Sequence, residues 1–147
     1  GDNIKNLNLS CKIEQGFVVF NDAQILNLSP TIISLFIDTV EVKPPVKGIS
    51  GDIKYALKAS IKSTQSYFGT AIKQQFMGIS PKWKGFSKVN NTKIFFMAAK
   101  TYGNESVNLD LNRHTGILNV MKISENKNSR VRMVSFDGTC SQTKRKF

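Results

Sequence analysis

The chain has 147 residues, of which 40% are hydrophobic and 21% are charged, and its formal net charge is +11. This length suits one domain, and this composition is typical of a globular protein rather than a disordered one. The apolar runs are too short for a transmembrane helix. We therefore expect a single β domain over residues 1–147 that needs no metal to hold its core.

Two cysteines, Cys11 and Cys140, lie near opposite ends of the chain. With one histidine they are too few for a zinc site. We predict that they form a disulfide that closes a loop of about 130 residues and stabilises the fold by about 4.9 kcal/mol. The alternative is two free thiols in a cytosolic protein. Because disulfides persist in oxidising compartments, the predicted bond favours a secreted or periplasmic location. The start at Gly1 instead of methionine fits signal-peptide removal, or an expression scar.

The first strands are predicted from alternation of apolar and polar residues. Residues 7–13 alternate with a period of two, which is typical of a half-buried strand. A turn is expected at Gly16, followed by a second short strand over residues 17–20.

A longer strand is predicted over residues 32–42, which are apolar and rich in β-branched side chains. Pro44 and Pro45 are expected to end this strand, because proline cannot donate a hydrogen bond to a sheet.

The middle of the chain is ambiguous. Residues 53–62 alternate as in a strand, but Ile53, Leu57 and Ile61 are also spaced as on one face of a helix. We favour the strand. The 66–78 region has room for one short helix.

The last third of the chain predicts further strands joined by a tight turn. These strands cover residues 94–100, 107–111, 117–123 and 130–136. Gly116 suits the left-handed position of the turn, and Arg113 is expected to brace it. Roughly seven or eight short strands with turns between them predict an antiparallel β-barrel or sandwich. A disulfide between the first and last strands would then fasten the closing edge of the barrel.

The turn 112–116 and the later Gly138-Thr139-Cys140 segment resemble the tail of a loose group of small secreted bacterial proteins of unknown function. That group shares an Asn/Asp-Arg-x-Thr-Gly hairpin turn, a Gly-Thr-Cys close and an early cysteine. The resemblance covers about a third of the chain and implies export and a β fold, but no activity.

Candidate catalytic residues are few. His114 is the only histidine, and a catalytic triad would need Asp110 to orient it and a nearby serine nucleophile. No G-x-S-x-G motif is present, and general acid–base groups are sparse. We therefore predict no enzyme, no metal site and no cofactor.

The lysines are unevenly distributed. Residues 53–104 contain nine lysines and no acidic residue. Lys54, Lys58 and Lys62 share one face whether the segment is a strand or a helix. The predicted anion-binding face comprises Lys54, Lys58, Lys62, Lys82, Trp83 and Lys84. An exposed Trp83 would stack on a base or sugar or sit at a membrane interface, and the alternative is that it packs over the core.

These features predict a non-catalytic secreted binding module for an anionic or amphipathic ligand or surface. Lipid, cell-wall polymer and nucleic acid are the candidate partners, although no specific nucleic-acid motif occurs. One alternative is a structural or interaction protein of the cell envelope without a small ligand. Another is that the excess lysine reflects an AT-rich genome and has no function.

Overall fold

The computed structural model describes residues 4–48, 51–63, 76–77, 83–100, 105–125, 128 and 130–142. The strands are β1 (Leu7–Phe20), β2 (Ile25–Asn27), β3 (Thr31–Gly48), β4 (Gly51–Lys62), β5 (Phe76–Met77), β6 (Trp83–Val89), β7 (Lys93–Lys100), β8 (Glu105–Asn112), β9 (Ile117–Ser124) and β10 (Val131–Gln142). They form one antiparallel sheet, so the predicted β fold is confirmed. The described residues contain no helix that could cross a membrane.

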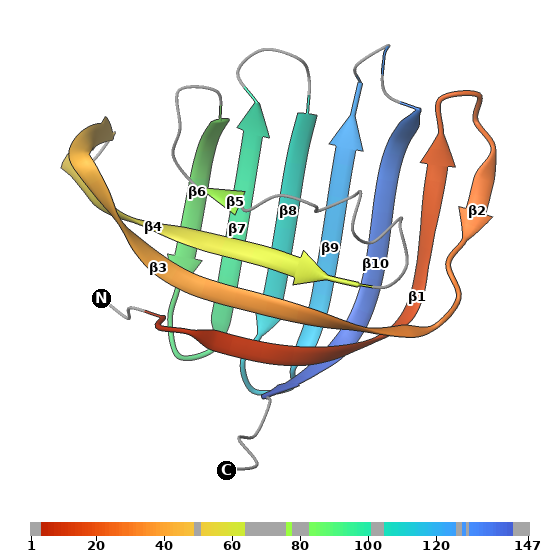
Figure 1. Cartoon of the computed structure of the whole chain (residues 1–147), viewed down its shortest axis with the longest axis horizontal. Helices are drawn as coiled ribbons and strands as arrows, with labels where there is room; N and C mark the ends of the chain where they lie inside the picture. The colour runs from red at the N-terminus through yellow and green to blue at the C-terminus, as the bar shows by residue number, and fades with distance from the viewer. Residues whose placement is uncertain are drawn as a thin grey trace.

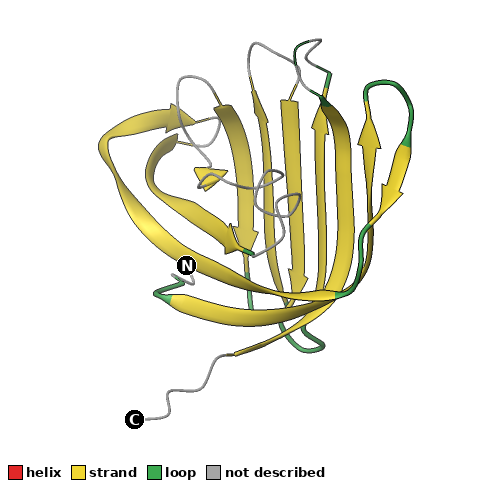
Figure 2. Ribbon diagram, turned by 45° about the vertical axis from the view of Figure 1, so that its right-hand side comes forward, coloured by secondary structure: helices red, strands yellow, loops and turns green. Residues whose placement is uncertain are grey.

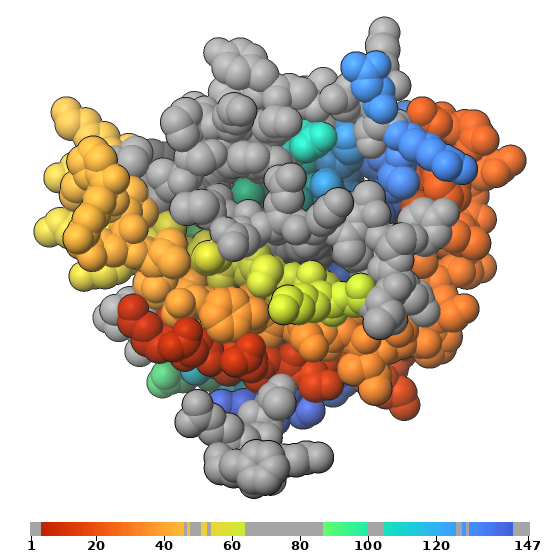
Figure 3. All heavy atoms as spheres, viewed as in Figure 1, coloured from red at the N-terminus to blue at the C-terminus, as the bar shows by residue number. Residues whose placement is uncertain are grey.

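The sheet curls into a nearly closed barrel. Its strand order is β5-β4-β3-β1-β10-β9-β8-β7-β6, and β2 pairs separately with β1. Figure 1 shows β6 to β10 side by side at the back, with β3 and β4 crossing in front of them. Figure 2 shows the curl from another side, and Figure 3 shows the atoms of β3 and β4 across the lower front of the molecule. The inner faces of these two layers therefore oppose each other.

Strand β1 connects the two layers because it bends along its length. Its first half, from Leu7 to Ile13, pairs with β3, and its second half pairs with β2. From Leu9 to Phe20 the strand also pairs with β10. That pairing shifts between Ile13 and Gln15, which leaves Glu14 as an extra residue. Such a bulge bends a strand and increases its twist.

The predicted turn at Gly16 is wrong, because β1 runs unbroken through this position. Gly16 lies opposite Phe136 on β10. A Cβ at Gly16 would collide with the Phe136 side chain and with the carbonyl oxygen of Ser135. The glycine therefore permits two strands to approach closely, and the bulge at Glu14 supplies the bend.

Strand β3 also differs from its prediction, because it continues past Pro44 and Pro45 to Gly48. The pairing of β3 with β4 is interrupted between Glu41 and Val46. Proline is tolerated where a ladder is interrupted, since its missing N–H then leaves no partner unpaired. The two prolines thus mark an irregularity within the strand rather than its end.

The ambiguous residues 53–62 lie in β4, so the prediction of a strand there is confirmed. The 66–78 region contains the two-residue strand β5, in which Phe76 pairs with Ala59 and Met77 with Lys58. The rest of the region expected to hold a short helix lies outside the described residues.

Cys11 and Cys140 form the predicted disulfide, with an S–S distance of 2.03 Å. They are directly opposite each other on β1 and β10. These strands are neighbours in the interior of the sheet order, whereas the two ends of that order are β5 and β6. The expectation that the disulfide fastens the closing edge is therefore wrong: the bond links the chain ends at the junction of the two layers.

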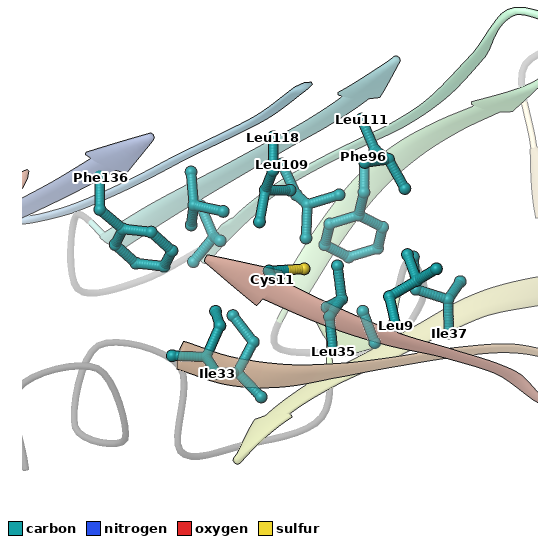
Figure 4. Packing of buried hydrophobic residues seen from close by; sticks show 14 of the residues in the cluster. Leu9, Cys11, Ile33, Leu35, Ile37, Phe96, Leu109, Leu111, Leu118 and Phe136 are labelled. Atoms are coloured by element: carbon teal, nitrogen blue, oxygen red, sulfur yellow. The ribbon is translucent and has the colours of Figure 1, made fainter. Parts of the chain in front are cut away.

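The core lies between the two layers. On the front layer Ile33 and Leu35 of β3 are buried, and on the back layer Phe96 and Phe136 are buried. Figure 4 shows Cys11 between these two sets. Full burial of one such apolar side chain contributes about 1.5–3 kcal/mol, so this cluster is the main source of stability.

Candidate functional site

The lysines of β4 lie on its outer face. Lys54 and Lys62 are exposed and Lys58 is half-buried, while Leu57 and Ile61 face the core. Consecutive lysines are four residues apart, which corresponds to about 13 Å along a strand. This spacing is too wide for one small anion, and it suits an extended anionic polymer or surface.

Lys82, Trp83 and Lys84 are the other members of the predicted anion-binding face. Among the described residues, no strand that carries them pairs with β4. Trp83 and Lys84 pair with Lys100 and Ala99 in β6 and β7, at the opposite end of the sheet order from β4 and β5. Their backbones are described but their side chains are not, and Lys82 lies outside the described residues. One continuous face from Lys54 to Lys84 therefore stays a prediction.

The turn between β8 and β9 is organised by its own backbone and by Asn112. Gly116 has a φ of 77°, and its N–H donates to the carbonyl oxygen of Asn112 at 2.8 Å. The Asn112 side-chain oxygen accepts the N–H groups of His114 and Thr115 at 2.9 and 3.0 Å. Side-chain capping of this kind satisfies backbone donors that have no ladder partner.

Arg113 ties this turn to the turn between β6 and β7. Its Nη1 donates to the carbonyl oxygen of Asn90 at 2.7 Å, and its backbone N–H donates to the carbonyl oxygen of Thr92 at 2.8 Å. Asn90 in turn accepts hydrogen bonds from the backbone N–H groups of Thr92 and Lys93. Arg113 therefore has a structural partner for its guanidinium.

No catalytic triad forms around His114 within the part of the chain that the structure describes. His114 is exposed on the turn, and Asp110 forms an ion pair of 3.1 Å with Lys93. Among the described residues, no group of three metal-ligating side chains comes together.

Lys122 of β9 lies on the inner face of the barrel wall. It is directly opposite Val107 on β8 and Val134 on β10, which are 2% and 3% exposed. Opposite residues of antiparallel strands share a face, so the stem of Lys122 lies among core side chains. The side chain is half-buried. Within the described part of the chain, no ion pair includes Lys122.

Ser124 lies two residues beyond Lys122 on the same inner face. It is 7% exposed, and its Oγ has no hydrogen-bond partner among the described residues. Glu105 of β8 lies opposite Ser124 and makes an interaction of its own within the chain. Most buried hydroxyl groups in folded proteins have a hydrogen-bond partner, so Ser124 is an exception.

An arginine lies at the same end of the barrel wall. The guanidinium carbon of Arg130 is 5.7 Å from the centre of the Phe20 ring. Phe20 pairs with Val131 at the start of β10, and both side chains pack against the core. Apolar side chains and a cation thus lie at the end of the wall where β9 finishes at Ser124.

Lys122 and Ser124 are the functional candidates that the sequence analysis missed. The sequence of β9 does not reveal them, because it has apolar residues on both faces: Ile117, Met121 and Ile123 alternate with Leu118 and Val120. Only the burial of Leu118 and Val120 shows that positions 122 and 124 face inward.

Comparisons with known proteins leave the chain without an assigned family. No protein-family model, no curated protein and no solved structure matches it. The interpretation of the site therefore rests on its own geometry.

Proposed function

We propose that this protein is a non-catalytic, secreted or periplasmic binding module for an anionic or amphipathic ligand, which it holds at Lys122 on the inner wall of the barrel. The observation that carries the proposal is the position of this lysine between two buried valines, without an ion-pair partner among the described residues. The Cys11–Cys140 disulfide is compatible with an oxidising location.

Burial makes Lys122 a better anion site than the exposed lysines. An ion pair at 4 Å is worth about 1 kcal/mol in water but about 4 kcal/mol at the effective dielectric constant of a partly buried site. Ion pairs between fully exposed groups contribute only about 0–1 kcal/mol of favourable free energy. A ligand anion at the half-buried Lys122 therefore gains more than one at the exposed Lys54 or Lys62.

A second candidate function is attachment to an anionic polymer or lipid surface of the cell envelope through β4, without a small ligand. The exposure and wide spacing of Lys54 and Lys62 favour it. Binding of this kind is diffuse and falls steeply with added salt, because exposed charges are screened beyond about 8–10 Å at physiological ionic strength. Binding at Lys122 depends less on salt.

The proposal is tested by thermal unfolding of the full chain with and without small amphipathic anions. A ligand whose concentration is about a hundred times its dissociation constant raises the free energy of unfolding by about 2.7 kcal/mol. This corresponds to a rise in Tm of about 5–10 °C. We expect Lys122→Met to abolish this rise. Lys54→Met makes the same change on the outer face and should keep it. No rise with any anion, or an equal loss in both variants, contradicts the proposal.

A further inference from the structure

We propose that the outer face formed by β1, β3 and β4 binds an acidic polysaccharide. Phe36 is the aromatic residue on which a sugar ring stacks, and Lys62 is the cation that pairs with a carboxylate of the polymer. This inference rests on the second candidate function, attachment to an anionic polymer through β4, and it does not depend on Lys122.

Phe36 of β3 is an aromatic side chain on the outer face of the front layer. Leu35 and Ile37 on either side of it are 1% and 0% exposed and belong to the core, so Phe36 points outward. Its side chain is half-buried, so part of the ring is accessible to a ligand. Figure 3 shows β1, β3 and β4 side by side across the lower front of the molecule. The ring therefore offers an apolar surface on this face.

The side chains around Phe36 on this face are polar and come from three strands. Two lie directly opposite Phe36 on the neighbouring strands, at Cβ separations of about 5 Å, and the others are about 7 Å away along β3 or diagonally. Hydroxyl and amide groups both donate and accept hydrogen bonds. An aromatic ring with such a border matches a sugar, which has apolar C–H groups on its face and hydroxyl groups at its edge. These neighbours are Asn8, Ser10, Ser34, Asp38, Ser60 and Lys62.

The charge complementarity of this face with an anion is greatest at Lys62. Lys62 is exposed and lies opposite Ser34, whereas Lys58 lies opposite Asp38, whose carboxylate offsets part of its charge. Within the described part of the chain, neither lysine takes part in an ion pair. Lys62 is diagonal to Phe36 across β3 and β4, at a Cβ separation of about 7 Å. A carboxylate on the sugar that covers Phe36, or on the next sugar, is therefore within reach of Lys62.

The spacing of the charges favours a polysaccharide over nucleic acid. Successive lysines of β4 are about 13 Å apart along the strand. Duplex DNA carries one negative charge for about every 1.7 Å of its axis. Single-stranded nucleic acids are bound by several aromatic side chains on which successive bases stack, and the described neighbours of Phe36 on this face include no second ring. A lipid bilayer would bury the surrounding hydroxyl groups without hydrogen-bond partners, which costs free energy.

The test compares four polymers that separate negative charge from sugar rings. Polygalacturonate has both, its methyl ester has the rings without the charge, poly-glutamate has the charge without the rings, and single-stranded DNA has charge and bases. Their affinities for the full chain are measured by calorimetry at physiological ionic strength. We expect polygalacturonate to bind most tightly. At 1 M salt, where the screening length is about 3 Å, its affinity should fall to that of the methyl ester.

Variants of the face locate the two contacts. Phe36→Leu should weaken polygalacturonate and its methyl ester about fivefold and leave poly-glutamate unchanged, because leucine keeps apolar volume but removes the ring. Phe36→Tyr should retain binding. Lys62→Met should weaken both polyanions about threefold and leave the methyl ester unchanged. The matched control Lys88→Met removes an exposed lysine from β6 in the back layer and should affect none of them. Unchanged denaturation midpoints show that the variants are folded.

The outcomes separate this inference from the second candidate function. Poly-glutamate that binds as tightly as polygalacturonate, with no effect of Phe36→Leu on either, would overturn the polysaccharide while leaving an anionic polymer on β4 in place. Single-stranded DNA that binds most tightly and depends on Phe36 would assign the face to nucleic acid instead. If no polymer binds, or if Lys62→Met and Lys88→Met weaken the polyanions equally, both the inference and the second candidate function fail.

Discussion

Gly116, in the turn between β8 and β9, rests directly on the backbone of Cys140. The N–H of Cys140 donates to the carbonyl oxygen of Gly116 at 2.7 Å. A Cβ at Gly116 would collide with the carbonyl oxygen of Cys140. The turn is thus fixed against the part of β10 that carries the disulfide, and only glycine fits between them.

Replacing Gly116 by alanine should therefore destabilise the protein by about 2 kcal/mol or more, as measured by chemical denaturation. Two effects combine: the φ of 77° disfavours alanine, and the added methyl meets the Cys140 carbonyl. Gly51→Ala is the control for backbone conformation, because Gly51 also has a positive φ, of 124°, but no described atom lies within 4 Å of an added Cβ. Equal losses in the two variants would show that the contact with Cys140 contributes nothing.

Removing the disulfide should lower the free energy of unfolding by several kcal/mol. The cysteines are 129 residues apart, and chain entropy predicts a loss of about 4.9 kcal/mol for a loop of this size. Replacing Cys11 and Cys140 together by alanine, or adding a reductant, should shift the denaturation midpoint by a similar amount. A loss below about 1 kcal/mol would contradict the chain-entropy account.

The buried hydroxyl of Ser124 should make the free protein less stable than it could be. Ser124→Ala removes a buried donor that has no partner in the described part of the chain, and it should raise the free energy of unfolding by about 1 kcal/mol. Thr39 is also buried, but its Oγ1 accepts the N–H of Ile4 at 3.1 Å, so Thr39→Val should destabilise instead. A stability loss in both variants would indicate that Ser124 has a partner within the fold.

The lysine face of β4 is tested by charge reversal. Binding to anionic vesicles, cell-wall polymer and nucleic acid should weaken when Lys54, Lys58 and Lys62 are changed to glutamate, and it should vanish for all forms at high salt. A control with the same change in net charge reverses the exposed residues Lys12, Lys88 and Arg132. If both triple variants bind alike, or if the unmodified protein binds none of these partners, the charge of β4 has no role in binding.

Much of the fold could be predicted because its strands alternate. The inward positions Leu109 and Leu111 and the outward positions between them follow a period of two, and β4 does the same despite its helical spacing. The irregular points could not be predicted. The bulge at Glu14 and the interruption of pairing before Val46 depend on which strands become neighbours, and no local pattern specifies that.

The position of the disulfide in the sheet could not be predicted for the same reason, because it depends on which strands are neighbours. The pairing of Cys11 with Cys140 follows from having two cysteines, but its place in the sheet interior follows from the order β3-β1-β10-β9. The candidate site was missed for a different reason. Lys122 and Ser124 are ordinary polar residues in the sequence, and they become notable only when Val107 and Val134 are found beside them.

The central claim is that the ammonium of Lys122 binds the anionic group of a ligand on the inner wall of the barrel. An NMR titration of the full chain with decanoate, with carbon-13 at the lysine Cε positions and Lys122→Met to assign the signal, tests it most directly. We predict that the Lys122 signal shifts as the ligand saturates the protein, while the Lys54 signal stays in place. A Lys122 signal that does not move at saturation would contradict the claim.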